Sequence, residues 1–295
     1  MFATAVLLLQ AIFQSPRLIE SSGVAVSRAY PDVLWTHNDS GDRPYLYATD
    51  LGGTDRGALL VPGADAIDWE DISLGPCPVA FSLPASACVY LADTGDNFEF
   101  RPFVTIYAVP EPPPPERASD TSGTTRAPAV LRLRYPDGPH DVEAVYVSPR
   151  DTAAYLVSKG VTRGSAIRVY RVDRRAWRTP DTTSDIVVAT LVQTLDIRPS
   201  SEAGRVVTAG AIRPDGRVVA IRTYTEIYLF YYSGVGGRLL PARDRPCNIA
   251  GLEIGGEAID FLDDSTFVLT SEAGSHRPGT IDTVKCALSR EQGNQ

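Results

Sequence analysis

The 295-residue sequence has few of the residue types that dominate enzyme active sites, with three histidines, four cysteines and one methionine. It contains no Gly-x-Ser-x-Gly elbow, no P-loop and no dinucleotide-binding fingerprint, which argues against the enzyme classes that carry those motifs. A basic excess is also lacking, because the net charge is −8. An acidic surface repels a phosphate backbone, so we expect no nucleic-acid partner.

Long apolar runs are missing except at the start of the chain, over residues 1–13. That run is too short for a membrane-spanning helix, which needs roughly 20 residues, but it is typical of the apolar region of a secretory signal. No Lys or Arg precedes it and Phe13-Gln14-Ser15 is a poor cleavage site, so a buried first strand and a mis-set start codon are alternatives. We predict a leader over 1–15, a folded domain over 16–295, no transmembrane anchor, and a secreted or periplasmic location.

The four cysteines form no Cys-x-x-Cys or His/Cys cluster that would indicate zinc. Cys77 and Cys88 bracket a short loop, and Cys247 and Cys286 fall on segments expected to be neighbouring strands. We therefore predict the pairs 77–88 and 247–286, which fit an oxidising compartment. Four buried free thiols are the alternative.

Helical periodicity is absent, and the chain instead alternates in β fashion with a recurring motif. A small or acidic residue, a small residue and then a β-branched residue open an apolar strand five times. The five segments are Ser22-Gly23-Val24, Glu70-Asp71-Ile72, Glu143-Ala144-Val145, Gly210-Ala211-Ile212 and Glu257-Ala258-Ile259. With a Pro-rich loop at about 110–128 and a polar segment at 173–185 set aside, the repeats approach the length of a four-stranded blade.

These repeats predict an all-β, single-domain β-propeller of five blades, with six blades or an open two-sheet sandwich as alternatives. The fifth repeat ends one strand short, and residues 17–20 precede the first repeat as each fourth strand precedes the next. We expect this N-terminal strand to close the ring and remove an exposed edge. The Pro-rich segment is expected to be an exposed loop outside any ladder.

In a propeller, the loops leading into the inner strands and those joining second to third strands open on one face. Glu70, Glu143 and Glu257 then occupy equivalent positions around the channel, where either some of them are protonated or a cation neutralises them. Two acid-Gly-acid turns, Asn38-Asp39-Ser40-Gly41-Asp42 and Asp93-Thr94-Gly95-Asp96-Asn97, open on the same face. The expected cation ligands are Asn38, Asp39, Glu70, Asp96, Glu143 and Glu257. Oxygen ligands favour calcium over magnesium, although self-capping Asx turns are the alternative explanation of the two strings.

Basic residues on the third and fourth blades, Lys159, Arg163 and Arg222, would hold an anionic or carbonyl-containing substrate opposite the cation. His37, beside Asn38 and Asp39, is the favoured general base among the three histidines, ahead of His140 and His276. Each of these residues is equally explained as an ordinary strand-end or loop residue.

The motifs Trp35-Thr36-His37-Asn38-Asp39-Ser40-Gly41-Asp42 and Asp68-Trp69-Glu70-Asp71-Ile72 resemble the first two blades of exported bacterial propellers of the SdiA-regulated and phytase-like esterase group. The resemblance implies an exported propeller with a central divalent cation on Asn38, Asp39, Glu70, Glu143 and Glu257. The Pro-rich insertion departs from the group's pattern.

Three functions fit these observations. The first is a metal-dependent hydrolase of a small phosphoester, lactone or ester, with His37, Lys159 and Arg222 in catalysis. The second is a non-catalytic extracellular module that binds a protein or glycan and carries a structural cation. The third is a structural subunit that assembles through strand edges or the proline loop, whereas the first two are consistent with the monomer that we expect.

Overall fold

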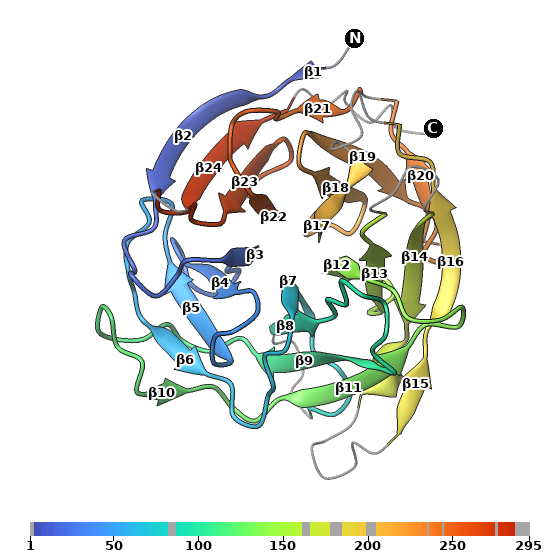
Figure 1. Cartoon of the computed structure of the whole chain (residues 1–295), viewed down its shortest axis with the longest axis horizontal. Helices are drawn as coiled ribbons and strands as arrows, with labels where there is room; N and C mark the ends of the chain where they lie inside the picture. Colours follow the sequence, from blue (N-terminus) through green and yellow to red (C-terminus); the bar gives the residue numbers. More distant parts are fainter. Residues whose placement is uncertain are drawn as a thin grey trace.

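The computed structural model describes residues 3–81, 87–160, 166–177, 185–198, 205–234, 236–243, 245–274 and 277–286. Five sheets lie around a central axis as the blades of a β-propeller (Figure 1). The predicted all-β, five-bladed fold is therefore confirmed. Over the described ranges the one helix is a 3-10 turn, η1 (Arg174–Ala176), and no helix there is long and apolar enough to cross a membrane.

In every blade the first strand lies nearest the axis (Figure 1). Blade 1 contains β3 (Ser21–Val26), β4 (Leu34–Asn38), β5 (Tyr45–Thr49) and β6 (Ala58–Leu60). Blade 2 contains β7 (Trp69–Pro76), β8 (Ala87–Asp93), β9 (Val104–Pro110) and β11 (Ala129–Arg134). Blade 3 contains β12 (Val142–Val147), β13 (Ala154–Ser158), β14 (Ile167–Val172) and β16 (Thr190–Leu195). Blade 4 contains β17 (Val207–Ile212), β18 (Val218–Thr223), β19 (Glu226–Tyr232) and two short outer strands, β20 (Leu239–Pro241) and β21 (Cys247–Asn248). Blade 5 contains β22 (Gly256–Phe261), β23 (Thr266–Ser271) and β24 (Thr280–Lys285).

The fourth strand of blade 5 comes from the N-terminus, as expected, but from a different segment. β2 (Val6–Ile12) pairs antiparallel with β24, and Figure 1 shows β2 along the outer side of β24. The prediction that residues 17–20 form this strand is wrong, because Asn38 holds that segment over the channel mouth by accepting bonds from the backbone N–H groups of Ile19 and Glu20. The apolar run at the start of the chain is therefore a strand in this structure.

Short strands from other segments cover three of the outer edges. β10 (Gly123–Thr124) pairs parallel with β6, β15 (Ile186–Val188) with β11, and β1 (Ala3–Thr4) with β21. β10 belongs to the Pro-rich insertion, so the expectation that this segment stays outside every ladder is wrong over two residues. Covering an outer edge in this way blocks pairing with another chain.

The hydrophobic core is divided among the seams between neighbouring blades. The described residues form five apolar clusters, and each combines side chains from two adjacent blades. Trp35 of β4 and Trp69 of β7, for example, are both buried in the seam between blades 1 and 2. Because the fifth seam joins blade 5 to blade 1, closing the ring buries apolar surface on both faces of every blade.

Both predicted disulfides are confirmed. Cys77–Cys88 joins β8 to the residue that follows β7 within blade 2. Cys247–Cys286 joins β21 of blade 4 to the residue that follows β24 of blade 5. The second disulfide therefore crosses a seam, whereas the first is local.

Candidate functional site

A β-bulge interrupts every inner strand at the same place. The register with the second strand skips one residue in each blade, and the skipped residues are Ser22, Glu70, Glu143, Thr208 and Glu257. A bulge leaves one residue out of the ladder and re-aims its side chain. All five are buried, and the bulges bring Glu70, Glu143 and Glu257 to equivalent places near the channel.

The bulge also corrects the alignment of the fourth repeat. The predicted motif Gly210-Ala211-Ile212 lies two residues too far along, because Thr208 is the residue that the register skips. Blade 4 thus contributes a hydroxyl where three other blades contribute a carboxylate.

Two groups of three carboxylates lie at this end of the channel and share Glu70. One contains Asp39, Asp68 and Glu70, and the other contains Glu70, Asp141 and Glu143. Within each group the three carboxylate oxygens lie within 4.8 Å of one another. Such a density of like charge needs protons or cations for compensation.

The ammonium group of Lys159 compensates the second group. Its Nζ lies 2.5 Å from Glu143 Oε1, 3.2 Å from Asp141 Oδ2 and 3.4 Å from Asn97 Oδ1. These contacts occupy all three donors of the ammonium group. Although burial opposes it, the charges of Glu143 and Asp141 raise the pKa of Lys159, so this residue acts as a tethered cation.

Among the described residues, no basic side chain forms an ion pair with Asp39, Asp68 or Glu70. Burial, followed by the charges of Asp68 and Glu272, raises the pKa of Asp39 to about 7. Burial, then the charges of Glu143 and Asp39, also raises the pKa of Glu70 well above its usual value. Asp68 likewise has a raised pKa because of burial and the charge of Asp141. Ionising all three carboxylates together is therefore unfavourable without a bound cation.

Two further features fit a cation at Asp39, Asp68 and Glu70. The Oδ1 atom of Asp39 is buried and has no hydrogen-bond partner in the described part of the chain. Gly95 leaves room for the carboxylates, since a Cβ at that position would lie 2.0 Å from Glu70 Oε1 and 2.4 Å from Asp68 Oδ2. The donor set consists of oxygen atoms alone, which suits a hard divalent ion.

Glu257 lies across the mouth from these groups. Burial raises the pKa of Glu143 well above its usual value, and the charges of Asp141 and Glu257 add to the rise. The hydroxyl of Tyr224 donates a hydrogen bond to Glu257 Oε1 at 2.8 Å. Burial raises the pKa of Glu257 to about 7, and the bond from Tyr224 partly offsets the rise. A carboxyl group that titrates near neutral pH suits general acid–base chemistry.

Asn38 and Asp96, both expected as cation ligands, are used by the local structure. The amide of Asn38 has four hydrogen bonds, to the backbone of Arg17, Ile19 and Glu20 and to the Asp42 carboxylate, and these fill its capacity. The Asp96 carboxylate accepts the backbone N–H groups of Phe100 and Arg101. Both side chains are therefore engaged in hydrogen bonds with the protein, although neither forms the self-capping Asx turn of the alternative explanation.

His37 and Arg222 are also enclosed. His37 is fully buried against the Trp69 ring, and burial lowers its pKa to about 4, so it is neutral at neutral pH. Arg222 is 1% exposed; its guanidinium pairs with Glu253 and donates to the backbone carbonyls of Ala258 and Thr270. These contacts hold blade 4 to blade 5 and leave Arg222 turned away from solvent. Arg163 and His276 lie outside the described residues.

The sequence contained a signal for the two carboxylates that the expected ligand set omitted. Asp68 and Asp141 each stand two residues before a bulged glutamate, in Asp68-Trp69-Glu70 and Asp141-Val142-Glu143. This repeated Asp-x-Glu spacing brings both acids to the same end of the channel in two adjacent blades. Gly95 belongs to one of the two acid-Gly-acid turns, whereas Tyr224 carried no comparable pattern.

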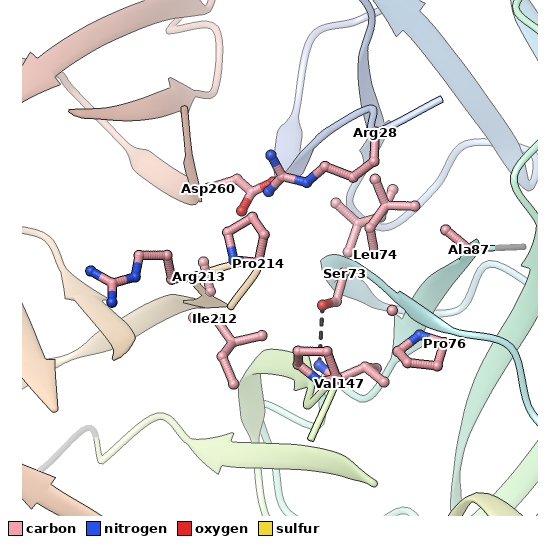
Figure 2. Close-up of a pocket in the computed structure, with 15 residues that line it drawn as sticks. Arg28, Ser73, Leu74, Pro76, Ala87, Val147, Ile212, Arg213, Pro214 and Asp260 are labelled. Atoms are coloured by element: carbon pink, nitrogen blue, oxygen red, sulfur yellow. Dashed lines mark hydrogen bonds and ion pairs between the residues drawn. The ribbon is translucent and has the colours of Figure 1, made fainter. Parts of the chain in front are cut away.

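The opposite end of the channel has a different chemistry. A pocket of about 180 Å³ lies among the carboxyl ends of the inner strands. Figure 2 shows Arg28 reaching across it toward Asp260, with Ser73 bonded to the backbone N–H of Val147. Between the two ends, the buried carboxylate of Asp71 accepts the backbone N–H groups of Val145 and Gly210, so it ties blades 2, 3 and 4 together.

No protein-family model and no curated protein matches this chain. Among solved structures, the PQQ-bound aldose sugar dehydrogenase of Streptomyces coelicolor has a TM-score of 0.54 and 11% identity over 97% of this chain and 98% of that chain. The periplasmic gluconolactonase PpgL of Pseudomonas aeruginosa has a TM-score of 0.44 and 13% identity over 94% of this chain and 69% of that chain. Regucalcin of Agrobacterium tumefaciens, a calcium-binding protein, has a TM-score of 0.43 and 10% identity over 96% of each chain. At such identities the dehydrogenase shows the β-propeller fold alone.

Proposed function

We propose that this protein is a divalent-cation-dependent hydrolase of a small phosphoester, lactone or ester, with the cation held by Asp39, Asp68 and Glu70. The observation that carries the proposal is the contrast between two adjacent groups of acids. Lys159 forms ion pairs with Asp141 and Glu143, whereas Asp39 and Asp68 have no ion pair with a basic residue in the described part of the chain and Asp39 keeps an unpartnered buried oxygen. A cation at this place supplies the missing charge.

This ligand set differs from the one expected from sequence. It keeps Asp39 and Glu70, adds Asp68, and leaves out Asn38 and Asp96, whose hydrogen bonds are satisfied elsewhere. Glu143 serves as the partner of Lys159. Calcium is favoured over magnesium because a cluster of carboxylates from two adjacent blades suits a flexible coordination shell better than a strict octahedron.

When bound, the cation supplies a Lewis acid that polarises the substrate oxygen. Residues of the chain are assigned the proton transfer and the positioning of the reacting groups. Glu257, whose pKa of about 7 allows it to take and return a proton near neutral pH, is the general base. Tyr224 orients the Glu257 carboxylate through its hydroxyl, and Lys159 holds Asp141 and Glu143 together in the wall of the site.

The proposal includes an exported protein related to the SdiA-regulated and phytase-like propellers, because the first two blades carry that group's motifs. The disulfides are compatible with a secreted or periplasmic location.

The test is thermal unfolding after chelation, followed by titration with calcium, magnesium or manganese. A cation that binds only the folded state raises Tm as its concentration passes Kd. We expect Asp68→Asn to weaken this response by at least about tenfold in concentration, since it removes a charged ligand, whereas Asp264→Asn, at a side chain that is 90% exposed, should leave it intact. No response to any cation in the wild type would refute the proposal.

Turnover separates the hydrolase from a binding module. Phe98 and Phe100, 86% and 70% exposed beside the acids, would equally suit a surface that binds a partner. If a cation raises Tm but the loaded protein hydrolyses no phenyl ester, γ-lactone or nitrophenyl phosphate, the binding module with a structural cation becomes the better account.

A further inference from the structure

We propose that the groove on blade 2 binds the neutral apolar arm of the substrate, so that the protein prefers carboxylic esters or lactones with an acyl or aryl chain over phosphoesters. The inference rests on the proposed function, because it assigns the substrate class of that same site.

The groove is continuous with the carboxylate cluster. It has a volume of about 620 Å³, which is within the range of small-molecule sites. Asp68 and Gly95 line it, and these two residues also border the proposed cation site. A ligand lying in the groove therefore reaches the acids with one end.

The walls of the groove are apolar and exposed. Phe98 and Phe100 are 86% and 70% exposed, and their ring centroids are 6.4 Å apart. Phe103, Tyr107 and Val130 also line the groove. Two adjacent exposed phenylalanines are unfavourable in water unless they bury against a ligand. They surround a space that an acyl chain or an aromatic ring would fill.

The charges around the groove disfavour an anionic arm. Four carboxylates line it, against two guanidinium groups, and Arg101 is already paired with Asp93 at 2.9 Å. The other guanidinium, that of Arg132, lies over the ring of Phe103 at 5.5 Å. A phosphate would meet repulsion from these acids, whereas a neutral chain would not.

Asp93 provides an independent sign that the groove takes a ligand with a polar group. It lines the groove, is 1% exposed, and its Oδ2 atom has no hydrogen-bond partner within the described ranges. A buried acceptor without a partner is unfavourable. A donor on the substrate, such as a hydroxyl group, would satisfy it.

The experiment compares p-nitrophenyl acetate, butanoate and octanoate as substrates of the calcium-loaded protein. Each methylene that enters an apolar site increases kcat/KM by up to about fourfold, so we expect octanoate to exceed acetate by at least about tenfold. In Phe98→Ala/Phe100→Ala the two esters should differ by less than about threefold, because the apolar walls are gone. Leu240→Ala is the matched control, since Leu240 is an exposed apolar side chain on β20 of blade 4.

A binding measurement keeps the inference testable if no ester is hydrolysed. N-phenylhexanamide is a neutral, hydrolysis-resistant probe, and calorimetry should show that it binds the wild type and Leu240→Ala alike but binds Phe98→Ala/Phe100→Ala at least about tenfold more weakly. That result without any turnover would support the groove and refute the hydrolase. Equal binding to wild type and double variant, or an octanoate-to-acetate ratio near one in the wild type, would overturn the inference.

Discussion

Glu70, Glu143 and Glu257 reach the channel mouth because each occupies the unpaired position of a β-bulge. An ordinary strand residue at that place would keep its ladder partner and its alternation between the faces of the blade. The bulge recurs in all five blades, but Ser22 and Thr208 take the other two positions. The acidity of the mouth is therefore decided by which bulge positions carry a glutamate.

Gly95 is the residue most sensitive to the geometry of the proposed cation site. Its φ is outside the left-handed region, so the backbone tolerates alanine, but the added Cβ would lie 2.0 Å from Glu70 Oε1. We expect Gly95→Ala to displace the carboxylates of Glu70 and Asp68 and to weaken calcium binding by at least about tenfold, or roughly 1.4 kcal/mol. Calcium titration followed by Tm measures this change.

Gly274→Ala is the control for that substitution. Gly274 also has an ordinary φ, and a Cβ there would meet no atom of the described residues within 4 Å. Its calcium response should match that of the wild type. If Gly95→Ala binds calcium as tightly as Gly274→Ala does, the acids beside Gly95 are not the ligands.

Lys159 allows a direct test of charge compensation. Lys159→Met removes the tethered cation from Glu70, Asp141 and Glu143, and a second divalent ion should take its place. Calorimetry should then show two calcium sites per chain instead of one, a result that Lys285→Met, which removes an exposed lysine from β24, should not reproduce. An unchanged stoichiometry together with unchanged stability would contradict this role for Lys159.

The strand β2 combines two features that are rarely found together. It pairs with β24 over six residues, and Gln10 donates a 2.7 Å hydrogen bond to the buried Asp282. Yet Val6, Leu8 and Ile12 are more than half exposed, which is unusual for an outer strand in water. Its sequence therefore satisfies both the description of a closing strand and the predicted export leader.

Truncation distinguishes these two descriptions. In protein produced without export, deleting residues 1–12 leaves β24 unpaired and removes the donor to Asp282, so we expect Tm to fall by at least about 5 °C. Leu8→Ser, at the position that the register between β2 and β24 skips, should change Tm much less. A truncated chain as stable as the full one would favour the leader, and N-terminal sequencing of the exported protein would then locate its cleavage site.

The two disulfides should contribute unequally because they close loops of different length. Their cysteines are separated by 11 and 39 residues. In the chain-entropy model the longer loop gives about 1 kcal/mol more stabilisation. Urea unfolding of Cys247→Ala/Cys286→Ala should therefore show a larger loss than Cys77→Ala/Cys88→Ala. An equal or reversed order would show that the cross-blade disulfide does not act through loop closure.

The blade count could be predicted from sequence because repeated strands alternate with period two and return at similar intervals. The closing strand could not, since residues 6–12 and residues 17–20 both precede the first repeat and both are apolar enough. Only the placement of Asn38, whose amide binds the backbone of the second segment, separates them. Local sequence patterns do not show which of the two segments a distant side chain such as Asn38 will bind.

Long-range contacts also explain why only part of the candidate site could be predicted from the sequence. The ring glutamates repeat in the sequence, so their common place was predictable, and Lys159 was recognised as part of the same mouth. Its partners, however, depend on distances between blades. The burial of His37 and Arg222 follows from the seams between blades, which no single repeat encodes. Whether a charged residue belongs to the site can therefore be decided only when the relative positions of the blades are known.

The cluster of acids makes the stability of the whole propeller depend on both pH and cation. In the chelated protein Asp39 and Glu257 have pKa values of about 7, whereas an unfolded chain has values of about 4. Because their pKa values are higher in the folded state, these two carboxyl groups contribute to the free energy of unfolding. That contribution is complete below about pH 4 and is lost as pH rises to about 7.

Calcium should oppose only part of this loss. Binding at Asp39, Asp68 and Glu70 requires ionised carboxylates, so it releases protons and strengthens as pH rises. We therefore expect the Tm difference between calcium-loaded and chelated protein to widen from pH 5 to pH 8, as measured by calorimetry. Glu257 is not a proposed ligand, so Glu257→Gln should flatten the pH dependence of both samples equally, whereas Asp39→Asn should shrink the gap between them. A gap that stays constant or narrows with pH would mean that the cation, if bound, does not replace protons on these acids.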